Sequence, residues 1–393
     1  MPAKTRLSRR LPGLRGLKLH SKVYLWPQSQ GKTTAISGDV YPPLTNSLKE
    51  NRRFIAGETG ALALARGEYV DALLYLQPVA STYWGDVAYI AERVLTVDEL
   101  KQFVDAHVPP PAPPKSSVED QPGGAGWLWN TDPALRLRDL LARRLVREGR
   151  YREAMRYFHS PQDTNFRDPD VRKHVTEYAQ ALHEANGDWR RINRARAWYQ
   201  AAVLARHSGM EMMGYEAAPD YFGLDGALDG GIGRANPGRC FTTDAELSRF
   251  ATSGAKPDLR FHYRFMAVDD AIRAADLLPP RSQAFAAVLC HATGWMMSTV
   301  GTAGNEREPE VLVHQLYHRY VKEGPHVAWA AHFGRKCPEP NFESAARLPR
   351  TLAVRHARHF VGHHRWQLGL SFGASLIALA AGLIWFRRRE IGP

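Results

Sequence analysis

At 393 residues, with 44% hydrophobic and 23% charged side chains, the chain has the composition of a folded protein, which excludes bulk disorder. Lys and Arg exceed Asp and Glu by 12, and the excess gathers in two acid-free segments near the ends, 1–22 and 347–365. Basic ends around a near-neutral middle favour contact with anionic lipid, and they argue against a nucleic-acid partner, which would need a basic face within the folded part.

The first segment, 1–51, shows little periodicity and reads as a basic irregular arm. It lacks the apolar core of roughly 7–15 residues that a signal peptide needs, so no export signal is expected. Gly31-Lys32-Thr33-Thr34 resembles part of a phosphate loop, but Trp26 stands where that motif requires glycine. We interpret the similarity as chance.

Helical periodicity marks the next region, 52–108. An Ala- and Leu-rich helix is predicted to end at Leu76, followed by a turn over 83–86 in which Asp86 caps the next helix. Thr96 and Glu99 have the spacing of a capping box, which predicts a helix over 97–108.

A Pro- and Gly-rich segment, 109–126, is the strongest predicted domain boundary, because its PPPAPP stretch favours an extended spacer. Helical periodicity returns over 127–208. The first helix of that region carries a one-sided apolar stripe of Leu135, Leu137, Leu140, Leu141, Leu145 and Val146.

The segment 209–257 is rich in glycine and is predicted to be an irregular insert without a regular element of any length. Its glycines around Arg234 would suit an anion, because successive backbone amides can cradle one. Its acidic residues are Glu211, Glu216, Asp220, Asp225 and Asp229.

Those carboxylates follow no recognisable catalytic spacing, and we assign no catalytic residue. We expect the side chains of Glu211, Asp220, Asp225 and His262 to lie scattered instead of converging beside Arg234. An enzyme or ligand sensor with its site in the insert remains the alternative function.

The region 258–335 is predicted to hold helical hairpins, with helices over 259–278, 281–297 and 308–333. A loop and a basic, His-rich juxtamembrane segment follow over 336–365. His356, His359 and His363 share one helical face and are weak candidates for a metal site, but a face resting on lipid headgroups is the favoured interpretation. We therefore predict no metal and no cofactor.

The segment 366–386 has no Asp, Glu, Lys or Arg across 21 residues and predicts a transmembrane helix roughly 31 Å long. Trp366 and Trp385 stand at its two ends, and an Arg-rich tail, 387–393, closes it. Small residues predict self-association of this helix as a homodimer; they are Gly369, Gly373, Ala378 and Gly382.

Orientation is not fixed by charge alone, because five arginines precede the span within 347–365 and three follow it in 387–389. The upstream majority and the missing signal favour a cytoplasmic body on a bacterial inner membrane. The cysteines Cys240, Cys290 and Cys337 fit a reducing compartment, since their spacing predicts neither a zinc site nor a disulfide framework.

One short pattern occurs twice. The first copy is Gly67-x-Tyr69-x-x-Ala72, and the second is Gly149-x-Tyr151-x-x-Ala154-x-x-x-Phe158. The pattern resembles the turn of a tetratricopeptide repeat (TPR), in which glycine ends one helix, the aromatic residue wedges between helices and alanine permits their close crossing. The helix-A tryptophan and the regular period of that family are missing, and a generic helical bundle remains the alternative.

We therefore predict an all-α fold, an irregular TPR-like array of helical hairpins with a Gly-rich insert and one C-terminal transmembrane helix. The resemblance implies a concave helical face that binds a peptide or helix of a partner protein. The favoured function is a membrane-tethered scaffold with protein and lipid partners. An effector that oligomerises through its transmembrane helix is a further alternative.

Overall fold

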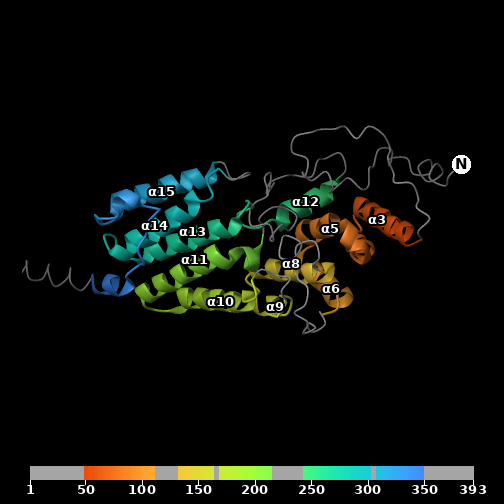
Figure 1. Ribbon diagram of the computed structural model, residues 1–393, viewed down its shortest axis with the longest axis horizontal. Coiled ribbons are helices and arrows are strands. Elements are labelled where there is room, and N and C mark those ends of the chain that lie inside the picture. Colours follow the sequence, from red (N-terminus) through yellow and green to blue (C-terminus); the bar gives the residue numbers. More distant parts are fainter. Residues whose placement is uncertain (1–47, 111–131, 163–167, 215–241, 302–306, 349–393) are drawn as a thin grey trace, which may run out of the picture.

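The computed structural model describes residues 48–110, 132–162, 168–214, 242–301 and 307–348, and all the regular elements in these ranges are helical. The expectation of an all-α fold is confirmed for this part of the chain. The helices lie in an elongated arrangement, with α3, α5 and α6 towards one end and α14 and α15 towards the other (Figure 1).

Apart from α3 and α8, the N-terminal end is built from short helices. Its elements are α3 (Leu48–Arg66), α4 (Tyr69–Leu76), the 3-10 turn η1 (Gln77–Val79), α5 (Ala80–Tyr89), the π-helix η2 (Ile90–Val94), α6 (Val97–His107), α8 (Pro133–Arg147) and α9 (Tyr151–Ala154). The apolar stripe expected on α8 is confirmed, since Leu137, Leu141 and Leu145 are fully buried. The helix also buries Arg138, Asp139, Arg143 and Arg144, so its charged side faces the protein as well.

The other end is built from longer helices that pack pairwise in sequence order. They are α10 (Val171–Gly187), α11 (Arg191–Met213), α13 (His262–Leu277), α14 (Gln283–Met297) and α15 (Glu308–Glu323), followed by the 3-10 turn η4 (Ala330–His332). Helix α11 lies against both α10 and α13 and joins the two ends, because its residues belong to both apolar cores.

The segments on either side of the expected 109–126 linker share one core. Val104 of α6 and Leu141 of α8 are fully buried in the same apolar cluster. The linker itself falls largely outside the described residues. The predicted boundary therefore joins two parts of one core instead of separating two.

The two copies of the repeated pattern fold into the same turn. Gly67 and Gly149 have φ of +81° and +74°, the left-handed region that glycine enters without strain. In each, the glycine amide bonds three residues back and the next amide bonds five residues back: Gly67 to Leu64 and Glu68 to Ala63, Gly149 to Val146 and Arg150 to Leu145. This pair of bonds is the Schellman motif, which satisfies the last carbonyls of α3 and α8.

After these turns the copies differ. Tyr69 and Ala72 are buried at the start of α4, and Ala154 and Phe158 are buried in the second copy, where Tyr151 is half-buried. Helix α9, however, ends after four residues. The second helix of a regular repeat hairpin is thus cut short at this point.

Two local predictions have opposite outcomes. The Thr96 and Glu99 capping box is confirmed, since the Thr96 hydroxyl accepts from the Glu99 amide and the Glu99 carboxylate accepts from the Thr96 amide. The cap predicted at Asp86 is wrong, because Asp86 is buried inside α5. The chain does turn near the predicted place, since Tyr83 has non-helical φ and ψ at a kink between two helical stretches of α5.

The insert is less irregular than predicted. Helix α12 (Asp244–Ser253) lies within it, capped by the Thr243 hydroxyl, and α11 continues as far as Met213. The prediction of no regular element is wrong there, because Thr243 and Glu246 supply a cap that outweighs the surrounding glycines. The helix predicted over 308–333 ends at Glu323, before Gly324 and Pro325.

Cys290 and Cys337 form a disulfide, which corrects the prediction of unpaired thiols. Their separation of 47 residues gave no spacing signal, and folding brings their Cα atoms to 5.6 Å. Cys240, the transmembrane glycines and the histidines of 347–365 lie outside the described residues. Among the residues described, which leave out 366–386, no helix is long and apolar enough to span a bilayer.

Candidate ligand cavity and docking groove

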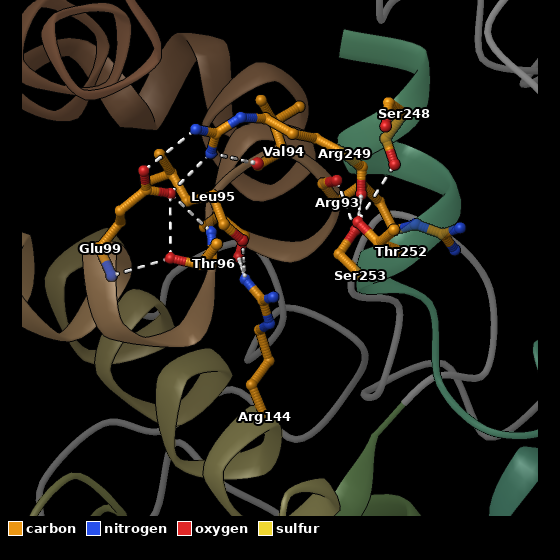
Figure 2. Close-up of polar contacts among 11 residues, drawn as sticks. Arg93, Val94, Leu95, Thr96, Glu99, Arg144, Ser248, Arg249, Thr252 and Ser253 are labelled. Atoms are coloured by element: carbon orange, nitrogen blue, oxygen red, sulfur yellow. Dashed lines mark hydrogen bonds and ion pairs between the residues drawn. The ribbon is translucent and has the colours of Figure 1, made fainter. Parts of the chain in front are cut away.

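The carbonyl end of the π-helix η2 receives arginines from two other helices. Arg144 of α8 donates from Nη1 to the carbonyls of Ala91 and Leu95, the latter at 2.8 Å. Arg249 of α12 donates to the Val94 carbonyl at 3.3 Å and to the Glu99 carboxylate at 2.7 Å (Figure 2). Unpaired carbonyls at a helix end favour cations, so these arginines stabilise a π-helix that would otherwise end with poor hydrogen bonding.

Arg93, a residue of the π-helix itself, in turn contacts α12 and the residues that follow it. Its side chain is 0% exposed, and its two terminal nitrogens lie 3.2 Å from the two Asp258 carboxylate oxygens. It also donates to the Phe250 carbonyl at 3.1 Å and lies 3.8 Å from the Phe250 ring centroid. The Ser253 hydroxyl donates to the Arg93 carbonyl in return (Figure 2).

We call these contacts the α12 clamp, made by Arg93, Arg249, Phe250, Ser253 and Asp258. The clamp brings the C-terminal end of the insert against the π-helix. Since the other end of the insert leaves from Met213 of α11, which also belongs to the N-terminal core, both ends are fixed to the body.

A cavity of about 570 Å³ lies where these ends meet. Its walls come from α8, α10 and α13, from Met213, and from 252–256, which include the clamp residue Ser253. Four cationic side chains line it, namely Arg144, Arg147, Lys256 and Arg273. Burial lowers the pKa of Arg144 to about 10, which leaves its guanidinium charged at neutral pH.

Asp270 is the deepest acid of this cavity. Burial raises the pKa of its carboxyl to about 7, opposed by the Arg273 guanidinium at 3.9 Å. The Tyr178 hydroxyl donates to its Oδ2 at 3.4 Å, and burial raises the pKa of that phenol well above its usual value. The Asp270 carboxyl is thus partly protonated near pH 7, and the only other acid among the described lining residues is the exposed Glu148, so the four cations give the lining a positive excess.

His262 also lines the cavity, fully enclosed. Burial lowers the pKa of its imidazole well below the ordinary value, and nearby Arg147 adds to the effect, so the ring is neutral at pH 7. A cationic wall with neutral acid, phenol and imidazole groups can bind a small polar anion by hydrogen bonding. We assign it no bond-breaking step, since the contacts described here pair no nucleophile with a base.

A second buried acid and histidine pair lies apart from the cavity. His159 Nδ1 is 2.8 Å from Asp139 Oδ2, and its Nε2 is 2.8 Å from the Asp168 carbonyl oxygen. Both ring nitrogens therefore face acceptors, an arrangement that the doubly protonated ring satisfies. Because neither nitrogen is left to take a substrate proton, the pair is structural and ties His159 and Asp168 to α8.

A groove of about 490 Å³ lies between α3 and η1, in the N-terminal part of the body. Its apolar surface comes from Leu48, Ala56, Pro78 and Val79, and its cations are Lys49, Arg52 and Arg53. Leu48 and Ile55, seven residues apart on α3, are 75% and 59% exposed. Large apolar side chains at this exposure, beside a groove, are typical of a protein-binding surface.

The two sequence-predicted site residues that the structure describes, Glu211 and His262, do not share the cavity. His262 lies in the cavity, and Glu211 lies half-buried on α11, outside its lining. Asp220, Asp225 and Arg234 fall outside the described residues, so their convergence stays a prediction. The described residues form no His, Cys, Asp or Glu cluster that would hold a metal.

Sequence reasoning missed the acid and the cations of the cavity. Arg144, Arg147 and Asp270 stand in no motif, and only the apolar stripe of α8 was recognised. The one signal in the sequence was the number of arginines in α8, which places some of them beside its apolar stripe. Comparison with models of protein families, with curated proteins and with solved structures finds no match for this chain.

Proposed function

We propose that the chain is a membrane-tethered helical adaptor whose groove beside α3 binds an acidic, amphipathic segment of a partner protein. The groove carries the proposal, because an apolar floor with three basic side chains complements a helix or peptide with one apolar and one acidic face. The tether is the predicted transmembrane helix over 366–386.

The arrangement of the body supports this function. The groove lies on α3 and η1, and α14 and α15 lie towards the other end of the elongated body (Figure 1). A partner held at α3 would thus contact the end of the body that is remote from α14 and α15.

The experiment uses a fluorescent peptide with leucine at helical spacing and glutamate elsewhere. We expect saturable binding by anisotropy and at least tenfold weaker binding to the double variant Arg52→Glu, Arg53→Glu, since charge reversal makes the rim repel the peptide. Arg152→Glu, an exposed arginine on α9, is the matched control. An equal loss of peptide affinity in both variants would show non-specific charge attraction and would reject the groove as the binding site.

A second function, ligand sensing, is favoured by the cavity. Both ends of the insert border it, so an anion bound by Lys256 and Arg273 would restrain the insert. Titration with succinate and with inorganic phosphate tests this by thermal shift. Lys256→Ala should abolish the shift and Lys173→Ala, an exposed lysine on α10, should keep it; no shift in the unsubstituted protein with either anion rejects this function.

A further inference from the structure

The disulfide lies where the body ends and the chain turns towards the predicted anchor. Cys290 is fully buried on α14, and Cys337 belongs to the segment 324–341 that follows α15. Apart from the one-turn η4, no regular helix holds this segment, although every one of its residues is described. Its position therefore depends on individual contacts.

Those contacts lay the segment against α14 on both sides of the bridge. The Gly334 amide donates to Cys290 Sγ at 3.2 Å, and His291 Nε2 lies 3.2 Å from the Pro338 carbonyl oxygen. Gln283 donates to the Glu339 carbonyl at 3.0 Å and accepts from the Asn341 amide at 2.8 Å.

The backbone of this segment also lies close to the backbone of α14. A Cβ on Gly294 would lie 2.3 Å from the Gly334 carbonyl oxygen, so this crossing requires glycine on α14. Phe333 stacks on Tyr320 with centroids 4.2 Å apart, which fixes the segment to α15 as well. The two cysteines thus face each other because the whole segment is packed there, and the bridge forms without backbone movement.

Whether a thiol pair held in this way is oxidised to a disulfide depends on the redox state of its compartment. Cytosolic thiols are kept reduced, whereas a disulfide forms and persists on the oxidising side of a membrane. Formation removes two protons and two electrons from the two thiols, and the acceptor is the disulfide of a thiol oxidase or isomerase of that compartment, which becomes a dithiol.

The charges around the predicted span allow this placement. Arg387, Arg388 and Arg389 stand together in a seven-residue tail, while the five upstream arginines are spread over 347–365. The positive-inside rule compares the Lys and Arg counts on the two sides of the span, and the upstream excess of two is small, so the rule does not exclude a cytoplasmic Arg387–Arg389.

We propose that Cys290 and Cys337 are joined in the cell and that the helical body lies on the oxidising side of the membrane, with Arg387–Arg389 on the cytoplasmic side. This orientation is the reverse of the one that the sequence favours. The proposed orientation rests on the proposed membrane tether, whereas the disulfide does not.

The first test reads the thiols of the full chain in a Cys240→Ser background. Cells are quenched in acid, and the denatured protein is treated with a maleimide-linked polymer before and after reduction. We expect no adduct before reduction and two after it. Adding Cys337→Ser should expose the Cys290 thiol and give one adduct without reduction, and two adducts on the unreduced Cys240→Ser chain would overturn the proposal.

The second test reads the sides of the membrane. A phosphatase that is active only after export should be active when fused at the N-terminus and inactive when fused after Pro393; the reverse pattern overturns the orientation. A chain released from membranes by alkaline carbonate, but still free of adducts before reduction, would reject the tether and keep the disulfide.

Discussion

Asp270 shows how burial can make a single carboxyl control stability. Its side chain is 1% exposed, and its pKa rises from 3.8 to about 7 in the folded protein. The folded state therefore holds the proton more tightly than the unfolded chain does. The stability that this supplies is present below pH 4, is lost as pH rises to 7, and changes little above.

Asp270→Asn should remove this dependence, since the amide does not titrate. We expect the variant to gain as much as about 4 kcal/mol relative to the parent between pH 4 and pH 8, the free energy of a three-unit pKa change. Urea unfolding at both pH values measures it. Asp71→Asn, which removes an exposed carboxylate on α4, is the control and should leave the pH dependence of the parent unchanged.

Gly149 tests the Schellman turn by itself. A Cβ there meets no atom within 4 Å, but the residue has φ of +74°, so the cost of Gly149→Ala is backbone strain without a clash. We expect a loss of about 1 kcal/mol in thermal or urea unfolding. Gly187→Ala, equally unobstructed at the last residue of helix α10, should be neutral or stabilising, and equal losses would contradict the assignment to strain.

Among the elements, α12 depends most on a single side chain. Arg93→Met removes an ion pair, a carbonyl contact and a ring contact together, while Asp258 keeps access to water with a side chain 39% exposed. We expect a loss of about 2 kcal/mol, below the cost of leaving a fully buried charge unpaired.

The same substitution should loosen α12 before the rest of the body. Hydrogen exchange should speed up over 244–253 and 90–94 and stay unchanged on α14. Lys173→Met is the control, because the Lys173 and Glu177 pair is exposed and contributes little. Unaltered exchange on α12 would show that the clamp does not hold it.

Elements were predictable from sequence where the determining contacts are local. The Thr96 capping box and the apolar stripe of α8 depend on residues within one or two turns, and both are present as expected. The two Gly-x-Tyr-x-x-Ala turns were found for the same reason. Their glycines and carbonyls are at most five residues apart.

Elements fixed by distant partners were missed. Helix α12 stands in a Gly-rich stretch and depends on Arg93, more than 150 residues earlier. The buried charges of α8 look like a solvent face until Ala91, Leu95 and Glu92 are placed beside them. The partner of Cys290 is likewise visible only after α15 and the segment after it have folded back.

For the whole molecule, membrane attachment is the property to test first. Deleting residues 365–393 leaves every described residue in place, so we expect a soluble, helical protein in place of a membrane-bound one. Sedimentation after a high-salt wash and circular dichroism measure the two properties. A truncated chain that still sediments with membranes would show that the uncharged span is not the anchor.

The α12 clamp also has a consequence for the order in which the molecule forms. It joins residues 157 and 165 positions apart, so the π-helix reaches its final environment only after α12 has been delivered to it. Contacts this distant in sequence slow folding, because a large loop must close before they form. The helices nearest the start of the described residues are therefore among the last to be completed, and until then Arg93 and Arg249 remain hydrated, unburied charges.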